Sequence, residues 1–347
     1  MKDPMAAGKA ASPKKPLVGV KAVAERANVA ISSVSRVLTD HPAVSPEMRK
    51  RVLAAAAELG YEPDLLAQGL RRGASLSIGF VVRDISNPVL AELALGAETE
   101  LSSAGYSMLL ANSHGDADGD AAGITLFRRR RVDGLLLSLS DETHEPTLAA
   151  IRGVDSPIVL IDRQLDEDSS IAAVLSDHGA GVRAALGRMI ELGHRRIGLV
   201  TGEGRIFPMR LITRIAEQVC REAGVELIVE SGELQAEDGS AEIRRMFTGG
   251  RAPTAILTAS NQILVGALHA LHDLGVRIPD DVSVVTFDDI PLLDLLDPPI
   301  ATISRQPFKL GQRCATVLLE QMRTGEKMTV TVPTIFNERG SLGPAPR

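Results

Sequence analysis

The side chains best suited to contact another molecule lie in a short helical pattern over residues 31–38. Apolar positions recur there at helical spacing and are expected to face inward: Val34, Val37 and Leu38. The opposite side presents Ile31, Ser32, Ser33 and Arg36. Short side chains with a single arginine suit contact with base edges in the major groove of DNA.

Neighbouring helical patterns would position this face. Apolar spacing predicts a first helix over residues 20–27, with a turn at Asn28 and Val29 before the second. A third helix is predicted from the N-cap Ser45 and Pro46 to Gly60. Its expected inner face is Val52, Leu53, Ala56 and Leu59. The arrangement predicts a helix-turn-helix, and an unrelated three-helix packing unit is the alternative.

The next segment, 61–70, predicts a short helix that folds only against a partner. Pro63 ends the previous helix, Asp64 can cap a new one, and Gly69 weakens it by about 1 kcal/mol. Leu70, at its end, suits a wedge in a minor-groove step. The alternative is a linker whose leucines pack on the rest of the protein.

The charge distribution separates this N-terminal part from the remainder. Residues 1–75 hold 12 Lys and Arg against 7 Asp and Glu, whereas the net charge of the whole chain is −6. A basic head on an acidic body suits a protein that presents only its head to a polyanion. Residues 1–17, rich in Pro, Ala, Gly and Lys, are expected to form a disordered arm.

After residue 75 strand-like runs alternate with amphipathic helical patterns. The strands are predicted at 77–82, 107–112, 134–139, 157–162, 172–177, 196–202, 226–231, 255–260 and 282–289. Helices are predicted between them at 89–105, 180–192, 210–224, 241–249 and 262–275. Continuous Val/Ile/Leu strands between helices indicate an α/β fold of doubly wound parallel sheets, covered on both faces.

Nine such strands exceed one usual domain and predict a two-lobed body. The expected organisation is an arm (1–17), an all-α helix-turn-helix domain (18–60), a hinge (61–72) and a body (73–347). The first lobe is predicted at about 76–175 plus 305–328, and the second at about 176–302 plus 329–347.

In these features the chain resembles LacI/GalR-type transcriptional regulators, the family of the lac repressor, over nearly its whole length. The matching stretches are VAERANVAISSVSRVL, VSPEMRKRVLAAAAELGYEPDLLAQGL, IGFVVRDISNPVL, RVDGLLL, IVLIDR, LGHRRIGLVTG, IPDDVSVVTFDD and ISRQP. The resemblance implies a body like a periplasmic sugar-binding protein, with an effector between its two lobes.

The resemblance also implies the DNA contacts. It places Ile31, Ser32 and Arg36 in the major groove and makes Leu70 the hinge leucine that opens the central step of a palindrome. The complete expected set is Val20, Lys21, Ile31, Ser32, Ser33, Arg36 and Leu70. Two departures are Ala30, where a capping Ser or Thr is usual, and Gly69, where Ser is common; both should make the free head more mobile.

By the same resemblance, six polar residues are expected to contact the effector: Asp84, Asn87, Asp162, Arg210, Asn261 and Asp288. Carboxylates and an arginine suit the vicinal hydroxyls of a sugar. Thr213-Arg214 and Ser260-Asn261 depart from the usual Gly-aromatic and Asn-Asp pairs. With no Trp, a stacking ring must come from a residue such as Phe80, Phe207 or Phe287. A sugar, a polyol, a modified sugar, a nucleoside and a pocket that has lost tight binding all stay open.

Other classes of function find no support in the sequence. Cys220 and Cys314, the only cysteines, form no CxxC pair or metal spacing, and no P-loop, GxSxG or HExxH motif occurs. We therefore expect no enzyme, metal or cofactor. The absence of an apolar span or signal core predicts a cytoplasmic protein without membrane contact, and the ending ERGSLGPAPR favours a homodimer over a tetramer.

The sequence thus predicts a repressor that binds a palindromic operator as a dimer under the control of a small molecule. The alternatives are a DNA-binding regulator that no longer senses an effector and a cytosolic carbohydrate-binding protein.

Overall fold

The computed structural model describes residues 18–38, 41–61, 74–165, 171–250 and 252–346. The chain divides into two compact units, Met1–Ser75 and Leu76–Arg347, which are called the head and the body below. No helix among the described residues is long and apolar enough to cross a membrane. The predicted hinge, including Leu70, lies outside the described residues.

The described part of the head contains three helices, α1 (Val20–Ala27), α2 (Ile31–Leu38) and α3 (Pro46–Leu59). Asn28 ends α1 in the left-handed region, with φ 53°, and Gly60 ends α3 with φ 61°. The Ser45 hydroxyl caps α3 by accepting from the Met48 amide at 3.3 Å. These local signals are the ones read from the sequence, because a cap or a left-handed turn depends only on neighbouring residues.

The three helices enclose a small apolar core. At its centre lie Val23, Val34 and Val52, each fully buried. The expected inner position of Leu53 is wrong, since this side chain is 49% exposed and Ala55 is buried instead. The reason is that α1 and α2 cover only one narrow stripe of α3, and helical periodicity does not determine the width of that stripe.

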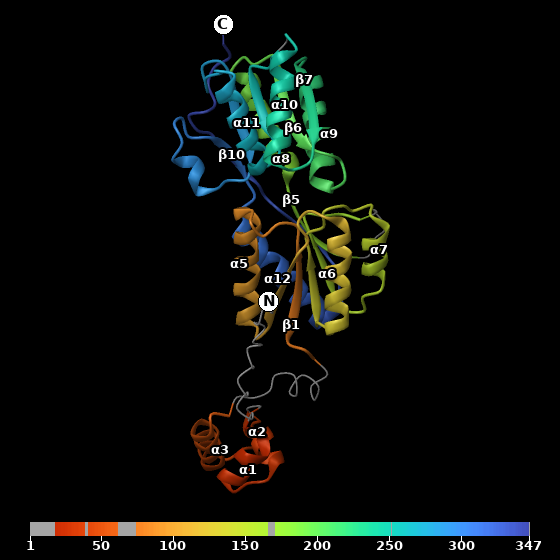
Figure 1. Ribbon diagram of the computed structural model, residues 1–347, viewed down its shortest axis with the longest axis vertical. Coiled ribbons are helices and arrows are strands. Elements are labelled where there is room, and N and C mark those ends of the chain that lie inside the picture. Colours follow the sequence, from red (N-terminus) through yellow and green to blue (C-terminus); the bar gives the residue numbers. More distant parts are fainter. Residues whose placement is uncertain (1–17, 39–40, 62–73, 166–170, 251, 347) are drawn as a thin grey trace, which may run out of the picture. The chain divides into compact units, whose positions relative to one another are not determined.

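The first lobe of the body is a parallel sheet with helices on both of its faces (Figure 1). Its strand order is β11-β5-β4-β3-β1-β2. Its strands are β1 (Ser77–Val82), β2 (Ser107–Asn112), β3 (Gly134–Leu137), β4 (Ile158–Ile161), β5 (Ala172–Ser176) and β11 (Thr329–Val332). Its helices are α5 (Pro88–Ser103), α6 (Ala117–Arg130), α7 (Glu145–Arg152) and α12 (Pro307–Thr324). Helices α5 and α12 pack on one face of the sheet, and α6 and α7 on the other.

The second lobe repeats this plan in the order β12-β10-β9-β8-β6-β7. Its strands are β6 (Arg196–Gly202), β7 (Glu226–Gly232), β8 (Ala255–Thr258), β9 (Ser283–Phe287), β10 (Ala301–Ser304) and β12 (Ile335–Asn337). Its helices are α8 (His178–Glu191), α9 (Phe207–Glu222), α10 (Ala236–Thr248), α11 (Asn261–Asp273) and the 3-10 helix η1 (Pro291–Asp294). Every strand pair is parallel except β10 with β12.

The predicted α/β class with two doubly wound lobes is confirmed. The assignment of residues 329–347 to the second lobe is wrong for β11, which pairs with β5 in the first sheet, Val330 opposite Val174. The described chain passes between the lobes after β5, after β10 and after β11. The last crossing was predicted before residue 329 and not after β11, because β11 is short and alternates polar and apolar residues, which is typical of a sheet edge.

Packing between α5 and α12 fixes the segment that precedes α12. Gly96 and Gly311 allow this close approach, since a Cβ on Gly96 would lie 2.0 Å from the Phe308 carbonyl oxygen. A Cβ on Gly311 would lie at the same distance from the carbonyl oxygen of Leu93. The crossing from β10 to α12, which carries Arg305, is therefore held tightly against the first lobe.

Glu242 of α10 is a buried carboxyl away from the cleft between the lobes. Its side chain is 2% exposed, and Nη2 of Arg245 lies 3.8 Å from its Oε1. The other oxygen, Oε2, has no hydrogen-bond partner. Burial raises the pKa of Glu242 to about 7, with Arg245 lowering it and Asp238 and Glu230 raising it.

We expect Glu242 to make the stability of the body depend on pH. A glutamate in an unfolded chain has a pKa of about 4.3, so the folded protein holds this proton more tightly. The stabilisation is fully present below the unfolded pKa and is lost as the pH rises through about 7. Glu242→Gln should therefore raise the free energy of unfolding by about 1–3 kcal/mol at about pH 8 and change it little near pH 4.5.

Urea unfolding at the two pH values measures this difference. The exposed Glu217 on α9 offers a matched control, since Glu217→Gln should leave both values unchanged. An equal effect of Glu242→Gln at both pH values would show that the carboxyl does not titrate between them.

Candidate functional site

Two carboxylates face each other at the carboxyl ends of corresponding strands in the two lobes. Asp162 follows β4 of the first lobe, and Asp288 follows β9 of the second. Both backbones lie in the left-handed region, with φ 48° and 71°. Aspartate tolerates this conformation better than most residues, and parallel sheets bind ligands at this edge.

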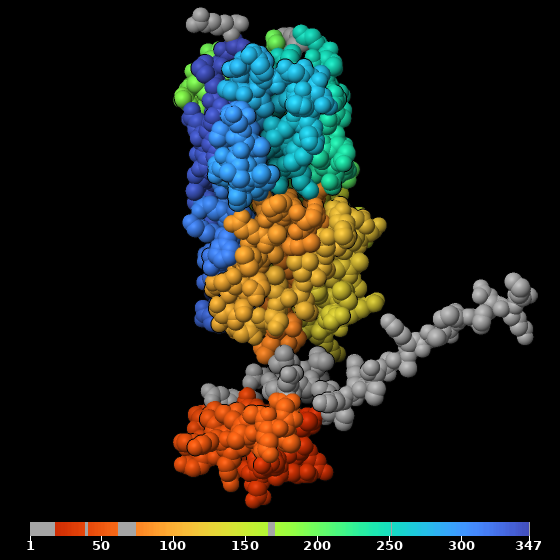
Figure 2. All heavy atoms as spheres, turned by 60° about the vertical axis from the view of Figure 1, so that its left-hand side comes forward, coloured from red at the N-terminus to blue at the C-terminus, as the bar shows by residue number. Residues whose placement is uncertain are grey.

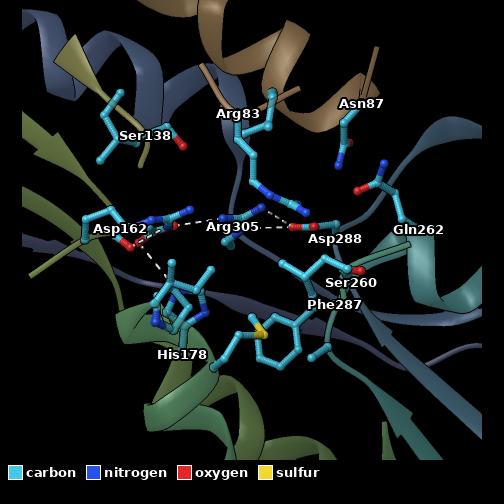
Figure 3. A pocket seen from close by; sticks show the side chains of 18 of the residues that line it. Arg83, Asn87, Ser138, Asp162, His178, Ser260, Gln262, Phe287, Asp288 and Arg305 are labelled. Atoms are coloured by element: carbon cyan, nitrogen blue, oxygen red, sulfur yellow. Dashed lines mark hydrogen bonds and ion pairs between the residues drawn. The ribbon is translucent and has the colours of Figure 1, made fainter. Parts of the chain in front are cut away.

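Arg305 lies between the two carboxylates and joins the lobes (Figure 3). Its Nη1 donates to Oδ2 of Asp162 at 2.8 Å, and its Nε donates to Oδ1 of Asp288 at 2.7 Å. The Arg305 side chain is only 15% exposed. Burial lowers the pKa of Arg305, but Asp288 and Asp162 outweigh it and raise the pKa above its ordinary value. The guanidinium is thus a fixed cation at the junction of the lobes.

Asp162 is held as a carboxylate by further neighbours. The Ser176 amide and hydroxyl donate to it at 2.5 and 2.9 Å. Burial raises the pKa of Asp162, but His178, Arg305 and the Ser176 hydrogen bonds outweigh it and hold the pKa well below its usual range. His178 Nε2 lies 3.4 Å from Oδ1, too far for a well-formed hydrogen bond. Neither nitrogen of this buried imidazole has a hydrogen-bond partner.

These groups line an internal cavity of about 60 Å³ between the lobes. Its polar lining comprises Arg83, Asn87, Ser138, Asp162, Arg163, His178, Ser260, Gln262, Asp288 and Arg305. Apolar side chains, including Phe287 and Met209, close the remainder. The volume is below the roughly 300 Å³ at which small-molecule pockets usually begin. One face of the body shows no open gap between the orange segment of the first lobe and the second lobe (Figure 2).

Direct hydrogen bonds join the lobes beside this cavity. Asn87 caps α5, and its side-chain amide exchanges hydrogen bonds of 3.2 and 3.1 Å with the amide of Asn261. Gln262 donates to the Asp84 carboxylate at 3.1 Å. Asp84 thus binds a residue of the second lobe, and Asn261 binds a residue of the first lobe. Neither of them lines the cavity.

Arg210 is also directed away from Asp162 and Asp288. Its guanidinium donates to the Glu142 carboxylate at 2.5 Å, and Glu142 in turn accepts from the Phe207 amide at 2.9 Å. Arg210 lines a separate cavity of about 360 Å³, together with Glu142, Phe207 and Arg214. Arg210 therefore does not line the cavity of Asp162 and Asp288, because the buried Glu142 carboxylate binds both its guanidinium and the Phe207 amide at the start of α9.

Of the six residues expected to contact an effector, the structure brings together Asn87, Asp162 and Asp288. The sequence reading missed Arg83, His178 and Arg305. Arg83 and Arg305 each come directly after a strand, at the end where polar side chains meet, and this position was the available signal. Of the suggested aromatic platforms, Phe80 is core, Phe207 lines the separate cavity, and Phe287 lines the central one, 5.5 Å from the His178 ring.

The expected DNA-contacting residues lie on the solvent side of the head. Lys21, Ile31, Ser32 and Arg36 are exposed, while Val20 and Ser33 are half-buried. The α2 helix begins without a side-chain cap at Ala30, whose carbonyl accepts from the Ser33 and Val34 amides. The described part of the head therefore presents one end of α2 and the start of α1 to solvent.

Comparison with known proteins places these features in a family. The description "Bacterial regulatory proteins, lacI family" matches residues 20–64, and "Periplasmic binding protein-like domain" matches residues 186–342. The ribose operon repressor of Bacillus subtilis (strain 168) is 32% identical over 302 residues, covering 86% of this chain and 90% of that protein.

Solved structures agree with the sequence comparison. The lac repressor dimer bound to operator and an anti-inducer has a TM-score of 0.85 at 26% identity, covering 94% of this chain and 100% of that one. A putative ribose operon repressor from Burkholderia thailandensis has a TM-score of 0.68 at 33% identity, covering 75% and 98%.

Proposed function

The chain belongs to the lacI family of bacterial regulatory proteins, and from this we propose that it is a cytoplasmic repressor that binds a palindromic DNA operator as a homodimer under the control of a small molecule. The observation that carries the DNA-binding part is the outward face of α2. It presents Ile31, Ser32 and Arg36 on a helix whose other side is buried in the head core. Such a helix can enter the major groove.

The effector is proposed to bind between the lobes of the body. The printed names of two similar proteins, from Bacillus subtilis and Burkholderia thailandensis, concern ribose, which supports a sugar or a related polyol. Asn87, Asp162 and Asp288 remain the proposed contacts in the central cavity. Asp84 and Asn261 are proposed to act at its margin, and Arg210 in the separate cavity beside Glu142, where hydrogen bonds join the lobes.

For the effector to control DNA binding, it must bind two arrangements of the lobes with different affinity. The contacts of Arg305, Asn87 and Gln262 all cross the cleft, so an opening of the lobes breaks all of them at once. A ligand that favours either arrangement shifts this equilibrium, typically by 1–3 kcal/mol. The predicted hinge with Leu70 would transmit the change to the head.

The experiment that tests the proposal is selection of binding sites from random duplex DNA by the full-length protein. A palindromic consensus with half-sites about one helical turn apart supports a dimeric operator-binding protein. Titration of the selected DNA complex with ribose, polyols and nucleosides then tests the control. Operator affinity unmoved by every compound would favour the alternative of a regulator that no longer senses an effector.

We expect Ser32→Ala and Ile31→Ala each to relax base preference at one position of the half-site. Each lost base contact should cost about 1–3 kcal/mol at that position, because the readout of a base edge is local. Repeating the selection with each variant measures the change. Glu25→Ala, an exposed position on α1 outside the proposed contact set, is the control. An unchanged consensus for both α2 variants would argue against direct readout by this face.

A further inference from the structure

The free hydrogen-bonding capacity of the central cavity belongs mostly to donors. Three of the four oxygens of its two carboxylates, which would hold sugar hydroxyls, already accept hydrogen bonds from the protein. Asp162 accepts from Ser176 and Arg305, and Oδ1 of Asp288 accepts from Nε of Arg305, with Nη2 of Arg305 2.7 Å from the same oxygen. A neutral polyol therefore meets one carboxylate oxygen, Oδ2 of Asp288, that accepts no hydrogen bond from a described residue.

Arg83 is the main unused donor. It follows β1 and extends into the cavity from the first lobe (Figure 3). Its guanidinium makes no hydrogen bond and no ion pair with a residue that the structure describes. Burial lowers the pKa of Arg83, and the charges of Asp84, Glu233 and Asp120 partly offset this effect. An arginine stays protonated at neutral pH even so, which leaves a desolvated cation without a direct partner.

The acidic neighbours of Arg83 are each engaged elsewhere. Asp84 accepts from Ser86 and Gln262. Asp120 accepts from the Ser140 amide at 2.6 Å, and Glu233 pairs with Arg205 at 3.3 Å. The negative charges of these three groups favour the charged form of Arg83. None of them accepts a hydrogen bond from its five N–H donors.

Other polar groups line the same cavity as Arg83. The buried His178 imidazole lines the same cavity; its Nε2 lies 3.4 Å from Oδ1 of Asp162, and neither nitrogen forms a hydrogen bond with a described residue. The Ser138 and Ser260 hydroxyls also line it. Each hydroxyl and the neutral imidazole can donate one hydrogen bond as well as accept one, so a ligand that offers acceptors can bind them together with Arg83.

We propose that the small molecule bound in this cleft is a sugar or polyol that carries an oxyanion, a carboxylate or a phosphate, and that Arg83 binds this group. The inference rests on the proposed function, since it specifies the ligand class of the same cleft. A planar guanidinium with parallel N–H groups matches the geometry of either oxyanion.

The space next to Arg83 supports the proposal. A neighbouring cavity of about 280 Å³ shares Arg83, Ile206 and Leu234 with the central one. Arg83 thus stands where the two cavities meet. A ligand that places its oxyanion at Arg83 can extend its hydroxyl-bearing part to either side, into more room than the central cavity alone provides.

The test is calorimetric titration of the full-length protein with four probes: ribose, ribose 5-phosphate, ribonate and inorganic phosphate. We expect ribose 5-phosphate or ribonate to bind at least tenfold more tightly than ribose, and the stronger of the two identifies the oxyanion. Arg83→Gln should reduce that affinity at least tenfold and reduce ribose affinity by a smaller factor, so that the preference for the anionic sugar is lost. The exposed Arg129 of α6 gives the matched control, since Arg129→Gln should change neither.

Three results would overturn the inference. The first is ribose binding as tightly as both anionic sugars. The second is an anionic preference that survives Arg83→Gln or that inorganic phosphate alone reproduces. The third is no binding of either anionic sugar. The proposed function is tested separately: if ribose alters operator affinity and binds as tightly as both anionic sugars, the repressor stands and the oxyanion fails. If no operator is selected, the repressor fails whatever the cleft binds.

Discussion

Replacing Arg305 by methionine is expected to lower the free energy of unfolding of the body by about 3–5 kcal/mol. The side chain is of similar length, so the loss comes mainly from charge. Asp162 is 1% exposed and Asp288 is 4% exposed, and both would remain as buried carboxylates without their shared cation. An uncompensated buried charge costs more than the intact pair contributes, which makes this one of the largest single effects available in the body.

The pH dependence of this loss distinguishes charge from packing. In the wild-type protein the pKa of Asp162 lies below its ordinary value. Its stabilisation is therefore present above the unfolded pKa of about 3.9 and is lost as the pH falls towards the folded value. Without Arg305 the carboxylates can take up protons more readily, so the deficit of Arg305→Met should be full at neutral pH and shrink in acid.

Urea unfolding measures the loss of stability in Arg305→Met, and two further variants test whether the loss comes from buried charge. Arg244, which pairs with Asp273 at 2.5 Å on the surface, is the matched control, and Arg244→Met should cost less than about 1 kcal/mol. Combining Arg305→Met with Asp162→Asn and Asp288→Asn should restore much of the stability, because no buried charge is then left. If Arg305→Met costs no more than the control, the bridge does not hold the lobes.

The second large effect is expected in the head, where Val52→Asp should unfold the three helices and abolish operator binding, by 100-fold or more. Val52 on α3 is fully buried and lies in the same apolar core as Val23 of α1 and Val34 of α2. An unpaired carboxylate at this position costs several kcal/mol. A domain of this size rarely has more than about 3–5 kcal/mol of stability, so the substitution exceeds what the head can tolerate.

Because the head and the body are separate compact units, Val52→Asp should unfold the head and leave the body folded. Loss of head helicity should appear in the circular dichroism spectrum, while the unfolding transition of the body stays at the wild-type position. Ala54→Asp introduces the same charge on the exposed side of α3 and should leave the head folded. If Val52→Asp retains operator binding, the packing assigned to this core is wrong.

Local signals explain why so much of the head was predictable. The bounds of α1 and α2 and the stop of α3 follow from periodicity, the Ser45 cap and the left-handed residues Asn28 and Gly60. Each of these acts within a few positions of the chain, as do the apolar runs that form the central strands of the body. Leu53 was misplaced because its burial depends on how far other helices cover α3.

The sequence by itself determined the family, the helices of the head, the central strands of both lobes and the location of Asp162 and Asp288 at strand ends. Only the tertiary structure decided which polar groups meet. Arg305 contacts a residue 143 positions away, and Asn87 pairs with a residue 174 positions away. Arg210, which matches a family position, instead binds Glu142. The physical reason is that a hydrogen bond acts over about 3 Å, and only the packing of two separately folded lobes brings such distant side chains within that reach.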